Sequence, residues 1–266
     1  MSRARSVLRQ LGPRVAAVGG LLLVWWAVAA TGMFDRTVLP GPGEVLDSLQ
    51  DNWVTERGIT EGIFAALQKS LLRLAFGMTV AVVLGTLIGV AMAASPFVQR
   101  SVGSLMTGLQ ALPSISWLPL AILWFGLSER AIVFVVIIGA FPAVALAAAN
   151  SIRLVPPLLV RAGRTLGASG WPLYRRVVLP AAVPGYVAGL QQAWALAWRA
   201  LMAGELIATG AQGLGHLQDT ARQQFDTPQV LAVMVVIILI GMAVDGAFAV
   251  GDRRIRGRRG LLTGAA

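Results

Sequence analysis

Charged side chains within apolar segments are the residues of this chain best placed to do chemistry. Arg199 and Asp245 each lie in a long apolar segment, and Glu205 lies near the end of the segment that holds Arg199. An ionised side chain at the centre of a bilayer costs at least about 2.5 kcal/mol, so it normally faces a partner or a water-filled cavity. Arg199 lies about 22 Å and Asp245 about 10 Å from the cytoplasmic ends of their segments, so we do not expect them to pair.

Arg199 is therefore a candidate for contact with an anion that crosses a membrane. We expect it to border a central pathway together with nearby hydroxyl and amide side chains. The alternative interpretation is that Arg199 extends to the membrane interface or meets Glu205 of another helix. Glu205 itself is more consistent with bracing an outer gate or a helix end than with catalysis. The predicted pathway residues are Gln110, Ser114, Ser116, Gln191, Gln192, Arg199 and Glu205.

Other chemistries lack the residues that they need. The chain has no Cys, which excludes a disulfide framework, a thiol nucleophile and a thiolate zinc site. Asp245 stands alone in its segment and His216, the single histidine, lies outside the apolar segments. An intramembrane protease or lipid transferase would need a Ser/His, paired-Asp or metal-ligand set in the membrane. We therefore expect no catalytic residue, no bound metal and no cofactor in this chain.

Composition places the chain among membrane proteins. It is 56% hydrophobic and 13% charged over 266 residues, with a mean hydropathy of +0.73. In a membrane protein the net charge of +10 indicates which side of the bilayer each loop occupies. We therefore expect the lipid bilayer as a partner and no nucleic acid. A crossing helix needs about 20 mostly apolar residues. Six segments qualify, at about 15–33, 74–94, 105–125, 131–151, 184–208 and 230–250, which predicts one all-α membrane domain over residues 1–266.

The distribution of charge predicts the topology, because basic residues stay on the cytoplasmic side of short loops. Fifteen basic residues fall on one side of the predicted membrane, together with a single acid, Asp252. They lie before the first span, at Arg100, in the loop of residues 152–180 and after the last span. Lys69, Arg73 and Arg130 fall on the opposite, outer side with most of the acids. Both termini are therefore expected in the cytoplasm of a multi-pass protein of the cytoplasmic membrane.

Proline and glycine modify these segments. Pro113 and Pro119 are expected to break the third span into short pieces, and interrupted helices often line cavities in transporters. In the second span, small residues recur every four positions, including Gly85 and Gly89, which favours close helix packing within the chain or between copies. Trp194 and Trp198 are expected to pack on one face of their helix.

Two shorter segments outside the spans are also predicted to be helical. Leu39-Pro40-Gly41-Pro42-Gly43 breaks the chain, and residues 44–53 then form a short amphipathic helix at the outer surface or an exposed loop. After Pro156-Pro157, an apolar spacing that includes Leu158 and Leu166 predicts a second amphipathic helix, which ends at Gly167. Trp171-Pro172-Leu173 begins another turn, and Leu179-Pro180 marks the return to the membrane. Held by anionic lipid alone, such a basic helix would need no protein partner.

This cytoplasmic loop resembles the EAA loop of bacterial ABC importer permeases, which docks the ATPase. Arg161-Ala162-Gly163, three residues, Gly167, nine residues and Val177-Val178-Leu179-Pro180 reproduce its spacing. Further motifs are similar to the nitrate, sulfonate and taurine branch, most closely to aliphatic-sulfonate permeases. They are Leu39-Pro40-Gly41-Pro42 with Glu44-Val45, Trp117 to Gly126, Ala203-Gly204-Glu205-Leu206-Ile207 and the weaker Gly213-Leu214-Gly215.

The resemblance implies a type I, MetI-like permease of six helices that works as a homodimer. It also implies an extracytoplasmic substrate-binding protein and two cytoplasmic ATPase subunits, which would bind ATP and Mg²⁺ and drive alternating access. The chain contains no G-x-x-x-x-G-K-[ST] phosphate loop, so ATP would have to bind another polypeptide. The implied docking residues are Arg161, Ala162, Gly163, Arg164, Leu166, Gly167, Leu179 and Pro180.

Arg161 stands where this family has Glu, and Gly163 where it has the second Ala. A reversed charge at a docking surface repels a basic partner. We therefore expect the ATPase to present an acidic or neutral groove opposite Arg161, unless Arg161 contacts lipid headgroups instead. The substrate stays open among sulfonates, taurine, nitrate, bicarbonate and pyrimidine precursors. A membrane scaffold without transport is the alternative of another class.

Overall fold

The computed structural model describes residues 2–33, 35, 37–54, 62–208 and 212–258. Within these ranges every regular element is a helix, as expected for an all-α protein. The chain divides into two compact units, one formed by Met1–Ala66 with Leu217–Val236 and the other by Leu67–His216 with Ile237–Ala266. Helices α10 (Leu214–Gln223) and α11 (Thr227–Arg258) contribute to both units.

The first unit contains α1 (Ser2–Ala30) and the short helix α2 (Pro42–Asp51). The expected helix at residues 44–53 is therefore confirmed, although it begins two residues earlier at Pro42, which suits the first helical position. The Glu44 carboxylate accepts a hydrogen bond of 3.1 Å from the Gly41 N–H and so caps the start of α2. The Trp25 indole donates to the Pro40 carbonyl (3.1 Å), which ties α1 to the segment that leads into α2.

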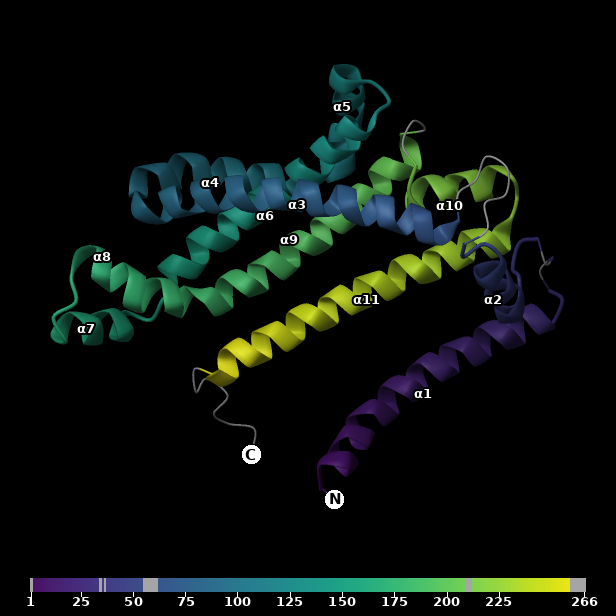
Figure 1. The fold of residues 1–266 in the computed structure, drawn as a ribbon, viewed down its shortest axis with the longest axis horizontal. Coiled ribbons are helices and arrows are strands. Elements are labelled where there is room, and N and C mark those ends of the chain that lie inside the picture. The colour runs from purple at the N-terminus through teal and green to yellow at the C-terminus, as the bar shows by residue number, and fades with distance from the viewer. Residues whose placement is uncertain (1, 34, 36, 55–61, 209–211, 259–266) are drawn as a thin grey trace. The chain divides into compact units, whose positions relative to one another are not determined.

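Helix α6 (Glu129–Arg153) is the centre of the second unit (Figure 1). It packs along α9 (Leu179–Ile207), and α3 (Ile63–Ala94) crosses it through glycines. A Cβ at Gly85 would lie 2.7 Å from the Val144 Cβ and 2.9 Å from the Phe141 carbonyl oxygen, so only glycine fits there. The small-residue row of the second span therefore serves packing within the chain.

The third predicted span is broken, as the prolines indicated. It consists of α4 (Pro96–Ala111), the single 3-10 turn η1 (Ser114–Trp117) and α5 (Leu118–Phe125). Leu112 is extended (φ −76°, ψ 124°) because the ring of the following Pro113 disfavours a helical conformation there. The two parts of this pair are bent by 97°, which suits a broken span or a re-entrant loop. Pro142, in contrast, lies inside a continuous α6.

Three helices in the described residues are long and apolar enough to cross a membrane, namely α3, α6 and α11, or four if the bent pair counts as one span. The six-span count and the cytoplasmic position of both termini stay predictions. Two helices begin well before the expected spans: α1 begins at Ser2, against an expected start at residue 15, and α3 begins at Ile63, against an expected start at residue 74. Lys69 and Arg73 therefore lie on a helix and not in an outer loop.

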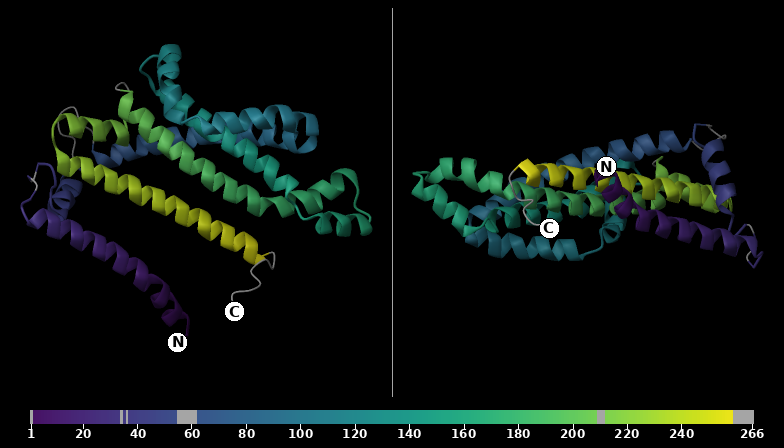
Figure 2. Two further views of the ribbon diagram at one scale, coloured as in Figure 1. Left: turned by 180° about the vertical axis from the view of Figure 1, so that it is seen from behind. Right: turned by 90° about the horizontal axis from the view of Figure 1, so that it is seen from below.

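The loop of residues 152–180 folds as its sequence signals indicated. It contains α7 (Pro157–Thr165), the short turn α8 (Gly170–Leu173) and a five-residue π-helix, η2 (Tyr174–Val178), which runs into α9. Figure 2 shows α7 and α8 beyond the end of α9. Gly167 has φ +83°, and the Gly167 and Ala168 N–H groups donate to the carbonyls of Arg164 and Gly163. These two hydrogen bonds together form the Schellman motif, which ends a helix at a glycine.

Candidate translocation, bracing and docking sites

Arg199 lies at a cavity of about 330 Å³ that is formed by the end of α4, η1, α6 and α9. Gln110 and Ser114 line the same cavity, so the structure brings together three of the predicted pathway residues. Arg199 is exposed and makes no hydrogen bond or ion pair with any described residue. Its guanidinium is therefore free to attract an anion at this surface.

The other predicted pathway residues lie elsewhere. Ser116 is exposed on η1, and Gln192 is exposed on α9 about two turns before Arg199. The Gln191 amide donates to the Asp245 carboxylate (3.3 Å), which connects α9 to α11. None of these three residues lines the cavity at Arg199.

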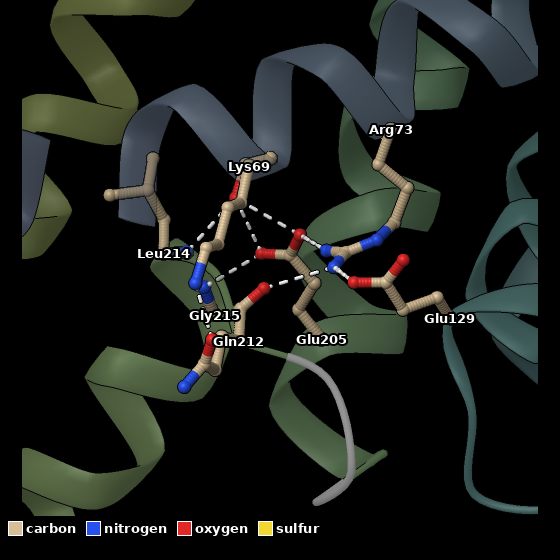
Figure 3. A network of polar contacts seen from close by, with 8 residues as sticks. Lys69, Arg73, Glu129, Glu205, Gln212, Leu214 and Gly215 are labelled. Carbon is tan, nitrogen blue, oxygen red and sulfur yellow. Dashed lines mark hydrogen bonds and ion pairs between the residues drawn. The ribbon is translucent and has the colours of Figure 1, made fainter. Parts of the chain in front are cut away.

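Glu205 is fully buried near the C-terminal end of α9, at the centre of a polar network (Figure 3). Its carboxylate accepts hydrogen bonds from the Ser70 hydroxyl (2.8 and 3.0 Å) and from the Gly215 N–H (3.0 Å). It also forms an ion pair with Arg73 of α3. Glu205 does not line the cavity at Arg199, and the structure places this predicted pathway residue inside a buried network at the end of α9.

Arg73 extends the network to two further segments. Its guanidinium donates to the Glu129 carboxylate at the start of α6 (3.0 Å) and to the Gln212 carbonyl (3.0 Å). Lys69, one turn earlier on α3, donates to the Gln212 side chain. The network therefore joins α3, α6, α9 and the segment that leads into α10. The charge pattern assigned Arg73 to the outer side, ahead of the second span, and did not indicate its partnership with Glu205.

The weak motif Gly213-Leu214-Gly215 is the segment of backbone that covers Glu205. A Cβ at Gly213 would lie 2.5 Å from the carboxylate atoms, and one at Gly215 would lie 2.7 Å from the Glu205 Cβ. The Leu214 N–H between them donates to the Ser70 hydroxyl (2.9 Å). Both glycines are thus needed because the backbone passes directly against the side chain, and this motif was the available sequence signal for the network.

The Trp194 and Trp198 rings stack, with centroids 5.8 Å apart and planes inclined by 10°. Both side chains are buried, which confirms that they serve packing. Among the described residues there is no group of three or more His, Cys, Asp or Glu side chains that could hold a metal ion.

On α7 the buried residue is Gly163, which faces α8 and η2. A Cβ at Gly163 would lie 2.8 Å from the Leu173 Cδ1 and 3.0 Å from the Val177 Cγ2. The residues around it are exposed: this holds for Arg161, Ala162 and Arg164, and Leu166 is exposed by 88%. The expected apolar stripe of this helix, which includes Leu158, is therefore not buried within the chain. Leu179 and Pro180 begin α9 beside it.

Comparison with known proteins agrees with this architecture. The chain belongs to the family described as binding-protein-dependent transport system inner membrane component, whose model matches residues 81–257. It is therefore a multi-pass ABC transporter permease of the inner membrane. The MetI-like fold is confirmed by the inward-facing MetNI methionine ABC transporter, which aligns with a TM-score of 0.63 at 21% identity over 72% of this chain and 95% of that one.

Two relatives cover most of the chain. The taurine transport system permease protein of Escherichia coli (strain K12) is 30% identical over 247 residues, which are 93% of this chain and 90% of that protein. The bicarbonate transport system permease protein of Synechococcus elongatus is 27% identical over 237 residues, or 87% and 84% of the two chains.

Proposed function

We propose that this chain is the transmembrane subunit of an ATP-driven importer for small organosulfonate anions of the taurine class. The observation that carries the proposal is the 30% identity to a taurine permease over 93% of the chain. The cavity at Arg199 supports it, because a free guanidinium beside the Gln110 amide and the Ser114 hydroxyl offers both charge and hydrogen bonds to a sulfonate. Bicarbonate is the competing anion that the second relative suggests.

In this proposal the loop with α7 docks a separate ATPase subunit, which binds ATP and Mg²⁺. The exposed side chains support a docking role: Leu158 and Leu166 are exposed by 74% and 88%, and Trp171 of α8 by 69%. Arg161 and Arg164 add positive charge to this surface. A second copy of the chain completes the pathway, and an extracytoplasmic binding protein delivers the substrate. Closure of the ATPases on nucleotide binding then pulls the docking helices together and opens the cavity outward, as one step of alternating access.

Transport by the reconstituted complex tests the proposal. The chain is purified with its ATPase, placed in liposomes with the binding protein, and assayed for ATP-dependent uptake of radiolabelled taurine, a longer alkanesulfonate and bicarbonate. We expect uptake of the sulfonates, and loss of most of that uptake in Arg199→Gln with partial retention in Arg199→Lys. Arg253→Gln serves as the matched control, because Arg253 is an exposed arginine on α11 that does not line the cavity.

Three results would reject parts of the proposal. Uptake of bicarbonate alone would reject the sulfonate class. Normal uptake and assembly by Arg199→Ala would reject the pathway role of Arg199. A chain that binds no ATPase and carries no solute would favour a membrane scaffold.

A further inference from the structure

A second cavity, of about 650 Å³, lies between α3, α5 and α6, and it shares Arg73, Lys69 and Glu129 with the edge of the Glu205 network. Charged residues and apolar residues occupy different ends of it. On α3 the lining runs from Lys69 and Arg73 to Phe76, and on α6 from Arg130 to Ile137. Each of these runs is about two helical turns, or about 10 Å, long. The cavity is thus a slot with a charged mouth and an apolar floor.

The mouth carries excess positive charge. Three basic residues and one acid line it, and the acid, Glu129, already accepts from Arg73. Arg130 is exposed and makes no hydrogen bond or ion pair with any described residue. The side chain of Arg73 is exposed by only 4%, and its Nε has no hydrogen-bond partner in the structure. An anionic group at the mouth would therefore meet the unpaired guanidinium of Arg130.

The apolar side chains of the slot are exposed on the surface of the helices. Leu72 and Phe76 of α3 are exposed by 72% and 62%, and Phe125 of α5 by 41%. Helices α3 and α6 are two of the three that are long and apolar enough to cross a membrane. Acyl chains are the apolar material that lies beside such helices in a bilayer. A small soluble anion would use the mouth only and would leave the floor empty.

From these observations we propose that the slot is a binding site for one anionic phospholipid. Its phosphate would lie at Arg130 and Lys69, and an acyl chain would lie along Phe76, Val133 and Ile137. A second copy of the chain that docked on this face with the same face would bring two basic surfaces together, which is unfavourable. The lipid would hold α5 and the start of α6 against α3, beside the Glu205 network.

Lipid binding by the full-length protein tests this site. The chain in mild detergent is titrated with phosphatidylglycerol and with phosphatidylcholine of the same acyl chains, and the bound lipid is counted by native mass spectrometry. We expect wild type to bind phosphatidylglycerol about fivefold more tightly, since one basic residue near an anionic headgroup contributes on that scale. Arg130→Gln should remove this preference and Arg130→Lys should keep most of it.

Two further variants separate charge from shape. Arg153→Gln is the matched control, because Arg153 is an exposed arginine at the opposite end of α6, and it should leave the preference unchanged. Val133→Trp should fill the floor and weaken the binding of both lipids while all charges remain. The melting temperature without added lipid verifies that each variant is folded.

The outcomes are distinct. Equal affinity of wild type for the two lipids, or an unchanged preference in Arg130→Gln, would overturn the lipid site. Displacement of phosphatidylglycerol by millimolar inorganic phosphate or glycerol phosphate, with no effect of Val133→Trp, would identify a site for a soluble anion instead. None of these measurements depends on transport or on the substrate.

Discussion

Arg73 and Glu205 are 132 residues apart in the sequence and form a buried ion pair that joins α3 to the end of α9. Their side chains are exposed by 4% and 0%. Such a pair is stabilised by additional hydrogen bonds, which Ser70, Gly215 and Gln212 supply here. The pair fixes the position where α3, α9 and the segment before α10 meet.

Removal of one partner of this pair should be strongly destabilising. Arg73→Met leaves an uncompensated buried carboxylate, so we expect a loss of about 3–5 kcal/mol in the free energy of unfolding. Glu129→Gln is the control, because Glu129 is 70% exposed and its ion pair with Arg73 should contribute about 0–1 kcal/mol. Thermal unfolding in detergent measures both.

The double variant Arg73→Met with Glu205→Gln gives a sharper test of the same pair. A glutamine can still accept from Ser70 and Gly215, and it leaves no buried charge. The double variant should therefore be more stable than Arg73→Met alone. Strictly additive losses would show that the two charges do not interact.

Gly213 should not tolerate a side chain. A Cβ there would lie 2.5 Å from the Glu205 carboxylate, so Gly213→Ala must displace the covering segment or the ion pair. We expect a loss of about 1–3 kcal/mol, as for other overpacked sites. Gly246→Ala on α11 is the matched control: nothing lies within 4 Å of its added Cβ, and alanine should be neutral or favourable there. Similar melting temperatures for the two variants would contradict the close approach.

The close crossing of α3 and α6 should also depend on the absence of a side chain at Gly85. Gly85→Ala brings a methyl group within 2.9 Å of a backbone carbonyl, which cannot rotate away as a side chain could. The expected cost is about 1–3 kcal/mol. Gly108→Ala on α4 has open space around the new Cβ and serves as the reference. Equal stability of these variants would place the contact between the two helices elsewhere.

Arg161 should select the ATPase through its charge. If the partner presents an acidic groove, Arg161→Glu should weaken binding by about fivefold or more, because a favourable contact becomes repulsive; opposite a neutral groove the affinity should stay nearly the same. Arg175→Glu, an exposed change of the same charge on η2, controls for the effect of net charge. Surface-immobilised ATPase and the detergent-purified chain give the two affinities. Tighter binding of Arg161→Glu would show that the groove is basic.

Local signals explain which parts of the structure could be predicted. The loop with α7 follows its sequence because Pro156, Gly167 and the Leu179-Pro180 pair each act on their own stretch of backbone. The break after Ala111 follows in the same way from Pro113. The start of α3 was missed because hydropathy detects only apolar residues, whereas the helix begins at Ile63 and continues through Lys69, Ser70 and Arg73.

Long-range pairing explains what could not be predicted. Glu205 was expected to brace a helix end, but nothing near it in the sequence names Arg73 as its partner. Long-range packing also explains why only some of the predicted pathway residues lie together. Gln110, Ser114 and Arg199 meet at one cavity, whereas Gln191 meets Asp245, and this difference depends on how α4, α6, α9 and α11 pack.

Helix α9 connects the two ends of the second unit as one continuous rod. It begins at Leu179, directly after the π-helix, and holds Glu205 about 39 Å further along. It stays helical through Pro184, so one element connects these points. A displacement of α7 and α8 that tilts or rotates α9 would therefore also move the Glu205 network near its far end. The five residues of η2 are then the part that can deform, because a π-helix can change its hydrogen-bond register where it joins α9 while α9 itself stays helical.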